Sequence, residues 1–189
     1  MNPEFKKNKY MIVKEVFPVP WCDIVINYAK FQSFYDFSPE KVESAQVPNS
    51  HSKYADFLME SLLLYFHPII EKNVEAPLFP TYSYYRVYKK GDILKPHIDR
   101  NECEVSASVA FGWPNSSIWP FKLENDKGEV TVWLNQGDAL IYAGPLVKHW
   151  REPLDESAYV QAFFHYVYAE GDNASLKFDR RAAIGQPRL

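Results

Sequence analysis

The spacing of apolar residues predicts two helices in the first part of the chain. Apolar side chains recur three and four positions apart in residues 21–32, as on one face of a helix. Residues 52–72 carry the strongest helical signal, with Asn49-Ser50 as an N-terminal cap. Pro68 is expected to kink or end this second helix. The apolar residues of the first segment are Trp21, Ile24, Val25, Tyr28 and Phe31.

Two other stretches before position 81 lack helical spacing. Residues 10–18 (YMIVKEVFP) are apolar and predict a short strand. Residues 33–50 are polar and contain two prolines, which predicts a loop. His51 and His67 lie in the cap region and in the Leu-rich helical segment, and we interpret both as packing or surface residues.

From residue 81 onward the chain has the pattern of a β protein. Short segments rich in β-branched or aromatic residues alternate with turn sequences, of which Gly137-Asp138 is one. Several short strands at this spacing favour an all-β sandwich or barrel. The pattern therefore predicts a mainly β fold with N-terminal helices. The expected strands are 81–89, 104–111, 117–124, 129–134, 138–143, 146–152 and 158–168.

Length and composition support one β-rich domain. The chain has 189 residues, within the roughly 100–200 that are typical of a domain. Aromatic residues make up 16% of it, which suits large side chains packed between sheets. Within this domain we expect an N-terminal strand and supporting helices in residues 1–80, a β core in 81–168 and a loosely held tail in 169–189.

Charge and cysteine usage narrow the functional classes. The net charge is −3 and no basic run extends beyond Lys6-Lys7, so no nucleic-acid partner is expected. Cys22 and Cys103 have no CxxC partners and are interpreted as two reduced thiols in preference to one disulfide. No apolar run approaches the ~20 residues that span a bilayer, and the charged start does not resemble a signal peptide. We therefore expect a soluble cytoplasmic protein without a membrane partner.

The strongest chemical signal is the sequence His97-Ile98-Asp99. Residues two apart on an extended segment project to the same face, so this pair presents an imidazole and a carboxylate together. A third ligand is expected to be another histidine, and we predict His149, which follows a strand and a turn. His165 is the alternative, but its position within an aromatic strand is more typical of a packed or supporting residue. Two histidines and one carboxylate suit Fe(II) enzymes that bind a co-substrate and O₂, and zinc can use the same ligands for hydrolysis.

These residues, in this order, resemble the 2-oxoglutarate- and Fe(II)-dependent oxygenases, on the prolyl-4-hydroxylase-like side. The resemblance covers about residues 81–168 and implies a double-stranded β-helix, a cupin-like jelly-roll with the metal at its open end. It also implies Fe(II), 2-oxoglutarate and O₂ as cofactor and co-substrates, with 2-oxoglutarate converted to succinate and CO₂ while a C–H bond is attacked. The residues that carry it are Tyr88, Gly91, His97, Asp99, Gly137, Asp138 and His149.

The co-substrate requires a cation inside the barrel. A buried carboxylate must be neutralised, and the planar fork of arginine matches it best. In much of the family this cation lies about ten residues beyond the second histidine, where this chain has Tyr159-Val160-Gln161. Arg151 follows His149 by two residues and shares its face on an extended strand, so we predict that Arg151 is the anchor. The alternative is a rim arginine paired with an acidic neighbour, Glu152 or Asp155. Arg86, Arg100 and Lys122 are the other candidate cations.

Several further residues are candidates for the same site. Tyr88 lies nine residues before His97 and matches a family tyrosine that contacts 2-oxoglutarate, although core packing is the alternative. Gln161 and His165 share one face of the last strand and can bond co-substrate or support the ligands, and Ser106 and Ser108 form a similar polar pair. Arg100 either positions substrate or braces Asp99. Leu94 stands where the family has a second tyrosine, which argues against recognition of peptidyl proline.

The leading hypothesis is an oxygenase that hydroxylates a small molecule or a peptidyl side chain. The alternatives are a cupin-like zinc or iron protein with non-oxidative chemistry, and a jelly-roll binding module without catalysis. Residues 33–51, 111–120 and the tail are expected to frame the entrance, because loops on a rigid barrel usually carry specificity. The sequence leaves the oligomeric state open.

Overall fold

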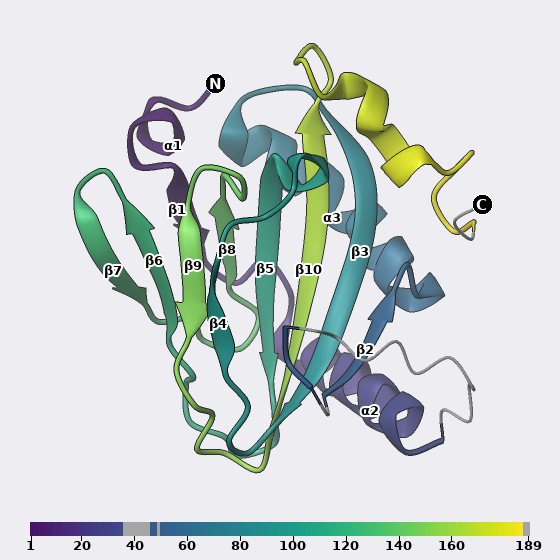
Figure 1. The fold of residues 1–189 in the computed structure, drawn as a ribbon. Coiled ribbons are helices and arrows are strands. Elements are labelled where there is room, and N and C mark those ends of the chain that lie inside the picture. Colours follow the sequence, from purple (N-terminus) through teal and green to yellow (C-terminus); the bar gives the residue numbers. More distant parts are fainter. Residues whose placement is uncertain (36–45, 49, 187–189) are drawn as a thin grey trace.

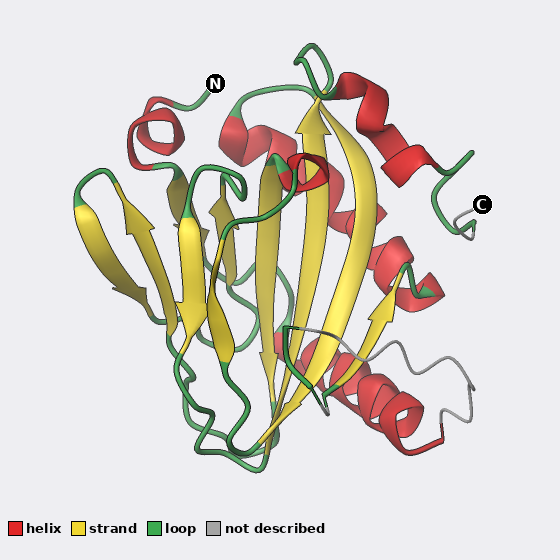
Figure 2. Ribbon diagram, in the orientation of Figure 1, coloured by secondary structure: helices red, strands yellow, loops and turns green. Residues whose placement is uncertain are grey.

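The computed structural model describes residues 1–35, 46–48 and 50–186. In this part of the chain the strands form two antiparallel sheets, one with the order β1-β8-β5-β10-β3-β2 and one with the order β4-β9-β6-β7 (Figures 1 and 2). This is the jelly-roll core that the sequence predicts. The strands are β1 (Tyr10–Val13), β2 (His51–Tyr54), β3 (Leu78–Lys89), β4 (Leu94–His97), β5 (Val105–Gly112), β6 (Phe121–Asn125), β7 (Gly128–Val132), β8 (Ala139–Tyr142), β9 (Lys148–Arg151) and β10 (Ala158–Tyr168).

β10 forms the centre of the larger sheet. It pairs with β3 on one side and β5 on the other, and every residue from Ala158 to Val167 is buried. Burial on both faces explains why its sequence is almost continuously apolar. Its few polar side chains, Gln161 and His165, are two of the predicted site residues. The other predicted site residues of this sheet lie on β3 and β5, the two strands that pair with β10.

Two helices cover the outer face of the larger sheet, α2 (Val19–Tyr35) and α3 (Phe57–Val74) (Figure 1). Both predicted helices exist, but the buried face of α2 is not the expected apolar stripe. Cys22, Val25, Ile26 and Ala29 are buried, whereas three large residues of the predicted stripe are exposed. A stripe read from spacing alone does not distinguish the two sides of a helix when both are apolar. The three exposed residues are Trp21, Ile24 and Phe31.

The start of α3 and the effect of Pro68 differ from the prediction. Asp56 caps the helix, because its Oδ1 accepts hydrogen bonds from the amides of Leu58 (3.1 Å) and Met59 (3.3 Å). The expected start near residue 50 is wrong, because His51–Tyr54 instead pairs with β3 as β2. Pro68 does not end the helix, which continues to Val74. Its missing amide would have bonded the carbonyl of Leu64, which lies on the exposed side of α3 where water can replace it.

The structure adds short elements that the sequence pattern did not predict. These include α1 (Pro3–Asn8), β4 and the 3₁₀ turn η1 (Asn101–Cys103). β4 was not predicted, because its four residues, LKPH, include two polar residues and a proline. The expected strand over 10–18 ends at Val13. Gly137, with φ +85°, and Asp138 form the predicted turn, in which the Asp138 carboxylate accepts a bond from the Asn135 amide (2.8 Å).

The C-terminal segment is packed and not loosely held as predicted. Residues Ala174–Arg180 form η2, which lies along β3. Asp179 and Arg181 are buried, and Arg181 forms an ion pair with the buried Glu60 (2.9 Å). Ion pairs, and not an apolar stripe, hold the segment, so hydrophobic periodicity gave no sign of it. No helix among the described residues is long and apolar enough to cross a membrane.

Candidate functional site

The pairing of β4 with β9 brings the three predicted metal ligands together. His97 lies directly opposite His149 in the register of the two strands. The distance from Asp99 Oδ1 is 3.8 Å to His97 Nε2 and 3.6 Å to His149 Nε2. The two imidazole ring centres are 4.2 Å apart. One nitrogen or oxygen from each residue therefore lies within 4.8 Å of the other two, around a common centre.

Each imidazole is oriented by a backbone carbonyl two residues earlier. His97 Nδ1 lies 2.8 Å from the carbonyl of Lys95, and His149 Nδ1 lies 2.9 Å from that of Val147. A carbonyl can only accept a hydrogen bond, so each Nδ1 carries the proton and each Nε2 lone pair faces the centre. Burial lowers the pKa of His149, which the charge of Asp99 opposes. Two neutral imidazoles and one carboxylate on one face fit a divalent transition metal such as Fe(II).

Asp99 is positioned by Gly144 and Ser106. The Asp99 amide donates to the Gly144 carbonyl (3.1 Å), and Ser106 Oγ lies 3.3 Å from Asp99 Oδ2. A Cβ atom on residue 144 would lie 2.6 Å from Asp99 Oδ2 and 2.5 Å from the Cys103 carbonyl oxygen. Only glycine allows this close approach. Nothing in the sequence pattern around Gly144 indicates this contact with Asp99.

His165 lies on β10, outside the group formed by His97, Asp99 and His149, and contacts that group through Ser106. Its Nδ1 lies 2.9 Å from Ser106 Oγ, and its ring packs against Tyr82 with centres 4.5 Å apart. Burial lowers the pKa of His165 to about 4. Asp99, Cys103 and His165 also lie close enough to share an ion. Burial raises the pKa of the Cys103 thiol, which disfavours the thiolate form that binds a metal.

A cavity of about 410 Å³ opens on the triad. Its walls are mostly aromatic and include two arginines, Arg86 and Arg100. Gln46 lines this cavity, whereas no residue of 111–120 and no described residue of the tail does, so those two parts of the expected entrance are wrong. Residues 36–45 and 49 of the 33–51 loop lie outside the described residues. The lining residues are Gln46, Tyr82, Tyr84, Arg86, Tyr88, Leu94, His97, Ile98, Asp99, Arg100, Cys103, Tyr142, His149, Phe163 and His165.

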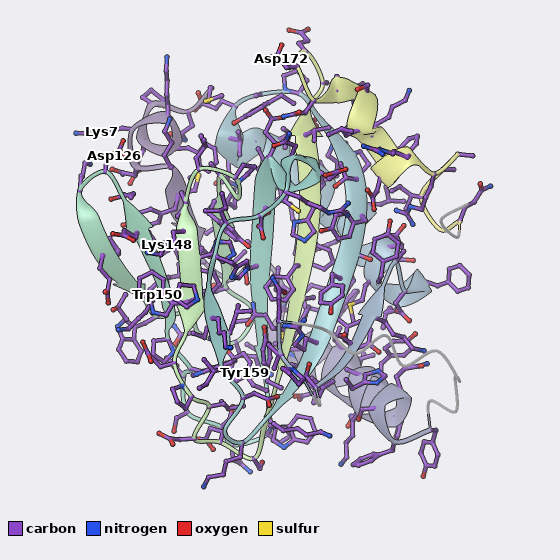
Figure 3. All side chains as sticks on the ribbon, viewed as in Figure 1. Lys7, Asp126, Lys148, Trp150, Tyr159 and Asp172 are labelled. Atoms are coloured by element: carbon purple, nitrogen blue, oxygen red, sulfur yellow. The ribbon has the colours of Figure 1, made fainter. Side chains whose placement is uncertain are left out.

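Side chains of β9 alternate between the two faces of the smaller sheet. Lys148 and Trp150 lie on the outside (Figure 3), whereas His149 and Arg151 are buried. Arg151 is 1% exposed, and its guanidinium lies 4.4 Å from the ring centre of Trp119 and 5.2 Å from that of Phe121. The prediction that His149 and Arg151 share an inward face is therefore confirmed. The rim alternative is wrong, because Arg151 pairs with neither Glu152 nor Asp155.

Arg151 has hydrogen-bond partners but no carboxylate partner among the described residues. Nη1 donates to the carbonyl of Trp119, and Nη2 donates to Gln161 Oε1 (2.9 Å). Gln161 in turn donates from Nε2 to Ser108 Oγ (2.8 Å) and the Val109 carbonyl (2.8 Å). Burial lowers the pKa of Arg151. A buried guanidinium without a counter-charge is costly, and this one is held in a fixed orientation.

Two buried polar atoms at this end of the barrel lack hydrogen-bond partners of normal geometry within the described part of the chain. They are Arg151 Nε and the hydroxyl of Tyr88. Both side chains contact Trp119, since the Tyr88 and Trp119 ring centres are 4.9 Å apart. Burial raises the pKa of Tyr88, and the charges of Arg86 and Arg151 oppose that shift. Tyr88 lines the cavity, and Leu94, which lies opposite Arg151 across β4 and β9, lines it too.

The other candidate cations differ in their access to the cavity. Arg86 lines it, is 1% exposed and donates from Nη2 to the Tyr84 hydroxyl (2.9 Å). Lys122 pairs with Glu129 (3.0 Å) and is not a lining residue. Arg100 lies at the cavity wall, but its donors are directed to Asp179. Arg86 thus remains the second candidate anchor.

His67 and the two cysteines are packed inside the protein or against it. His67 stacks on Tyr166 with ring centres 5.5 Å apart, and its Nε2 lies 2.8 Å from the Leu78 carbonyl. Cys22 and Cys103 are both free and buried, as expected of reduced thiols.

Comparison with known proteins finds similarity at the level of structure only. No family model matches the chain, and no curated protein matches its sequence. A Pseudomonas putida prolyl-4-hydroxylase superposes with a TM-score of 0.66 at 14% identity, over 86% of this chain and 95% of that one. The epimerase SnoN from nogalamycin biosynthesis, in complex with Fe³⁺, α-ketoglutarate and nogalamycin RO, gives 0.68 at 14% identity, over 98% and 90%. HygX from Streptomyces hygroscopicus, with nickel, 2-oxoglutarate and hygromycin B bound, gives 0.63 at 15%, over 90% and 88%. At these identities the likeness shows a shared fold.

Proposed function

We propose that this chain is an Fe(II)- and 2-oxoglutarate-dependent oxygenase that hydroxylates a C–H bond and releases succinate and CO₂. One observation carries the proposal. Two imidazole nitrogens and a carboxylate oxygen converge at a cavity. Two residues beyond His149 on β9, Arg151 is buried without a carboxylate partner in the described residues, although it is not itself one of the residues that line the cavity. Solved structures of this fold hold iron or nickel together with 2-oxoglutarate, which supports the same pair of ligands here.

His97, Asp99 and His149 would hold the metal through Nε2, a carboxylate oxygen and Nε2. When bound, Fe(II) supplies the activation of O₂ that is coupled to decarboxylation of 2-oxoglutarate. The protein contributes orientation. The carbonyls of Lys95 and Val147 fix the two imidazoles, and outer partners of this kind commonly strengthen metal binding.

Arg151 would anchor the distal carboxylate of 2-oxoglutarate. It already donates from Nη2 to Gln161, so its fork is oriented before the ligand arrives. Gln161 thus acts through Arg151, and Ser108 acts through Gln161. The Tyr88 hydroxyl can donate a hydrogen bond to a carboxylate oxygen. A carboxylate between these groups would satisfy the atoms that lack partners and neutralise the buried charge.

The cavity limits the substrate to a small molecule or one side chain of a peptide. Its volume of about 410 Å³ is near the lower end of the roughly 300–1,000 Å³ of ligand sites. The co-substrate and the substrate must share this space. Leu94 contributes an apolar wall where the prolyl-hydroxylase-like pattern has a tyrosine, which argues for a substrate other than peptidyl proline.

The test is an anaerobic titration followed by exposure to O₂. Protein loaded with Fe(II) should develop a visible charge-transfer band when 2-oxoglutarate is added, and should then form succinate when O₂ is admitted. His149→Ala protein is the matched control and should show neither. Preferential binding of zinc, no band and no succinate would instead indicate a cupin-like protein with non-oxidative chemistry or none.

A further inference from the structure

The residue that follows the ligand Asp99 connects the site to the C-terminal segment. Arg100 donates from Nη1 to Asp179 Oδ1 (3.0 Å) and from Nη2 to Asp179 Oδ2 (2.9 Å), a bidentate pair. Its Nε lies 3.4 Å from the Tyr82 hydroxyl, and its guanidinium lies over the Tyr82 ring at 4.5 Å. Each nitrogen of the fork therefore already has a partner within the protein. Arg100 is thus a brace and not a free donor for substrate.

Asp179 is held in an uncommon backbone conformation. Phe178, Asp179 and Arg180 have φ values of +58°, +52° and +63°, in the left-handed region that residues other than glycine seldom adopt. Such conformations persist where surrounding contacts determine them. Asp179 is completely buried and also accepts a hydrogen bond from the Tyr54 hydroxyl. Arg181, two residues after Asp179, is held by its ion pair with Glu60 and by a hydrogen bond from its Nη2 to the Thr81 carbonyl (2.8 Å).

The same contacts reach the wall of the cavity. Tyr82, against which Arg100 packs, lines the cavity and contacts His165, which bonds the Ser106 that touches Asp99. Arg100 therefore constrains the metal-ligand loop directly through the chain and indirectly through Tyr82. A change at Asp179 would release both constraints at once.

We propose that Asp179 is a positioning residue for the metal centre. By fixing Arg100, it holds residues 98–103 so that the Asp99 carboxylate faces His97 and His149, and the C-terminal segment is in this sense a part of the active site. The inference rests on the proposed function for the identity of the ligand that Asp99 would bind. The geometric part, that Asp179 orders the 98–103 loop, stands independently of it.

The test compares Asp179→Asn with Arg180→Gln. The first keeps the shape of the side chain but removes the charge that pairs with Arg100. The second changes the neighbouring residue, whose side chain is largely exposed and makes only one long ion pair with the loop, to Glu102 (4.0 Å), and an exposed pair of this kind contributes little. Ni(II) affinity is measured by calorimetry, and amide hydrogen exchange of residues 98–103 is measured in the metal-free protein. Asp179→Asn should weaken Ni(II) binding about tenfold, the low end for residues that orient ligands, and speed exchange in 98–103. Arg180→Gln should leave both unchanged.

Two outcomes separate this inference from the proposed function. If Asp179→Asn speeds exchange in the C-terminal segment alone and binds Ni(II) like wild type, Asp179 only fastens that segment and the inference is wrong. If wild-type protein binds no Ni(II), the proposed function fails, and exchange in 98–103 still decides whether Asp179 orders the loop. Arg100→Lys, which keeps the charge but loses the fork, should fall between wild type and Asp179→Asn in loop exchange. If Arg100→Lys alone speeds loop exchange as much as the Arg100→Lys, Asp179→Asn double variant does, the bidentate geometry of the pair is what orders the loop.

Discussion

The two ends of the barrel interior differ in how completely the protein itself bonds their polar atoms. At the metal end, the protein itself bonds the atoms that orient the ligands, namely both Nδ1 atoms of the histidines and one oxygen of Asp99. At the Arg151 end, Arg151 Nε and the Tyr88 hydroxyl have no hydrogen-bond partner of normal geometry among the described residues, although the Tyr88 hydroxyl, whose pKa burial raises, lies close enough to Arg86 for that charge to oppose the shift. The first end is arranged before any ligand arrives. Under the proposed function a ligand would complete the second end, so the two ends should respond differently to mutation.

The largest effect is expected from removing a ligand at the metal end. His149→Ala deletes one of three donors, so Ni(II) affinity should fall by more than the roughly 100-fold that loss of an outer partner can cost. Calorimetry measures the change. His67→Ala, which alters a histidine far from the cavity, is the control. An affinity within tenfold of wild type for His149→Ala would contradict the assignment of the triad.

Acid should destabilise the metal-free protein through His165. Its pKa is about 4 in the folded protein against 6.5 for the free side chain. Between these values the unfolded chain binds more protons, so stability falls as pH decreases from about 6.5 to 4. The loss is at most about 3 kcal/mol. Urea unfolding across this pH range measures it, and His165→Asn should flatten the slope. An unchanged slope would mean that His165 is already protonated when folded.

At the Arg151 end, replacing the cation should affect the ligand more than the fold. Arg151→Met should weaken 2-oxoglutarate binding to Ni(II)-loaded protein by about 2 kcal/mol or more, or about 30-fold. The stability without ligand should change little, because an uncompensated buried charge is removed along with its hydrogen bonds. Arg86→Met is the matched variant. A larger loss of affinity for Arg86→Met would assign the anchor to β3 and not to β9.

A smaller effect is expected where the metal end is crowded. Gly144→Ala places a methyl group against Asp99 and the Cys103 carbonyl, so Ni(II) affinity should fall about tenfold, as for other ligand-orienting residues. Gly128→Ala, at the first residue of β7 where φ is +109° and a residue other than glycine would be strained, controls for general destabilisation. It should lower the melting temperature and leave metal affinity unaltered. Equal metal affinity in both variants would mean that Asp99 can move without loss.

The smallest effect is expected two steps away from the ligand. Ser108→Ala removes one acceptor of Gln161 Nε2 but leaves the Val109 carbonyl in place. The affinity for 2-oxoglutarate should therefore fall by only about 1 kcal/mol, roughly fivefold. Titration of the Ni(II)-loaded variant measures it. A loss as large as that of Arg151→Met would show that Gln161 is held by Ser108 alone.

The sequence predicted what short spacing determines and missed what the pairing of distant strands determines. The alternation of strand residues was enough to place His97 with Asp99, and His149 with Arg151, on shared faces. The role of Gly144 was not predicted, because glycine is required there by the contact with Asp99, 45 positions earlier in the chain. The role of Asp179 was not predicted, because buried ion pairs produce no periodic pattern in the sequence. The buried face of α2 was misread because its exposed side is also apolar, so spacing alone left both orientations equally plausible.

The pairing of His149 and Arg151 on one short strand gives the barrel a measure of length. Two residues of extended backbone span about 7 Å, and this interval separates the backbone positions of His149, a candidate metal ligand, and Arg151, the cation that would receive the far carboxylate. β9 pairs with β4 on one side and with β6 on the other, so the interval cannot adjust. A diacid one carbon shorter or longer than 2-oxoglutarate would meet the metal or the cation, but not both in good geometry. Selection of the co-substrate would then be a property of the backbone repeat as much as of any side chain.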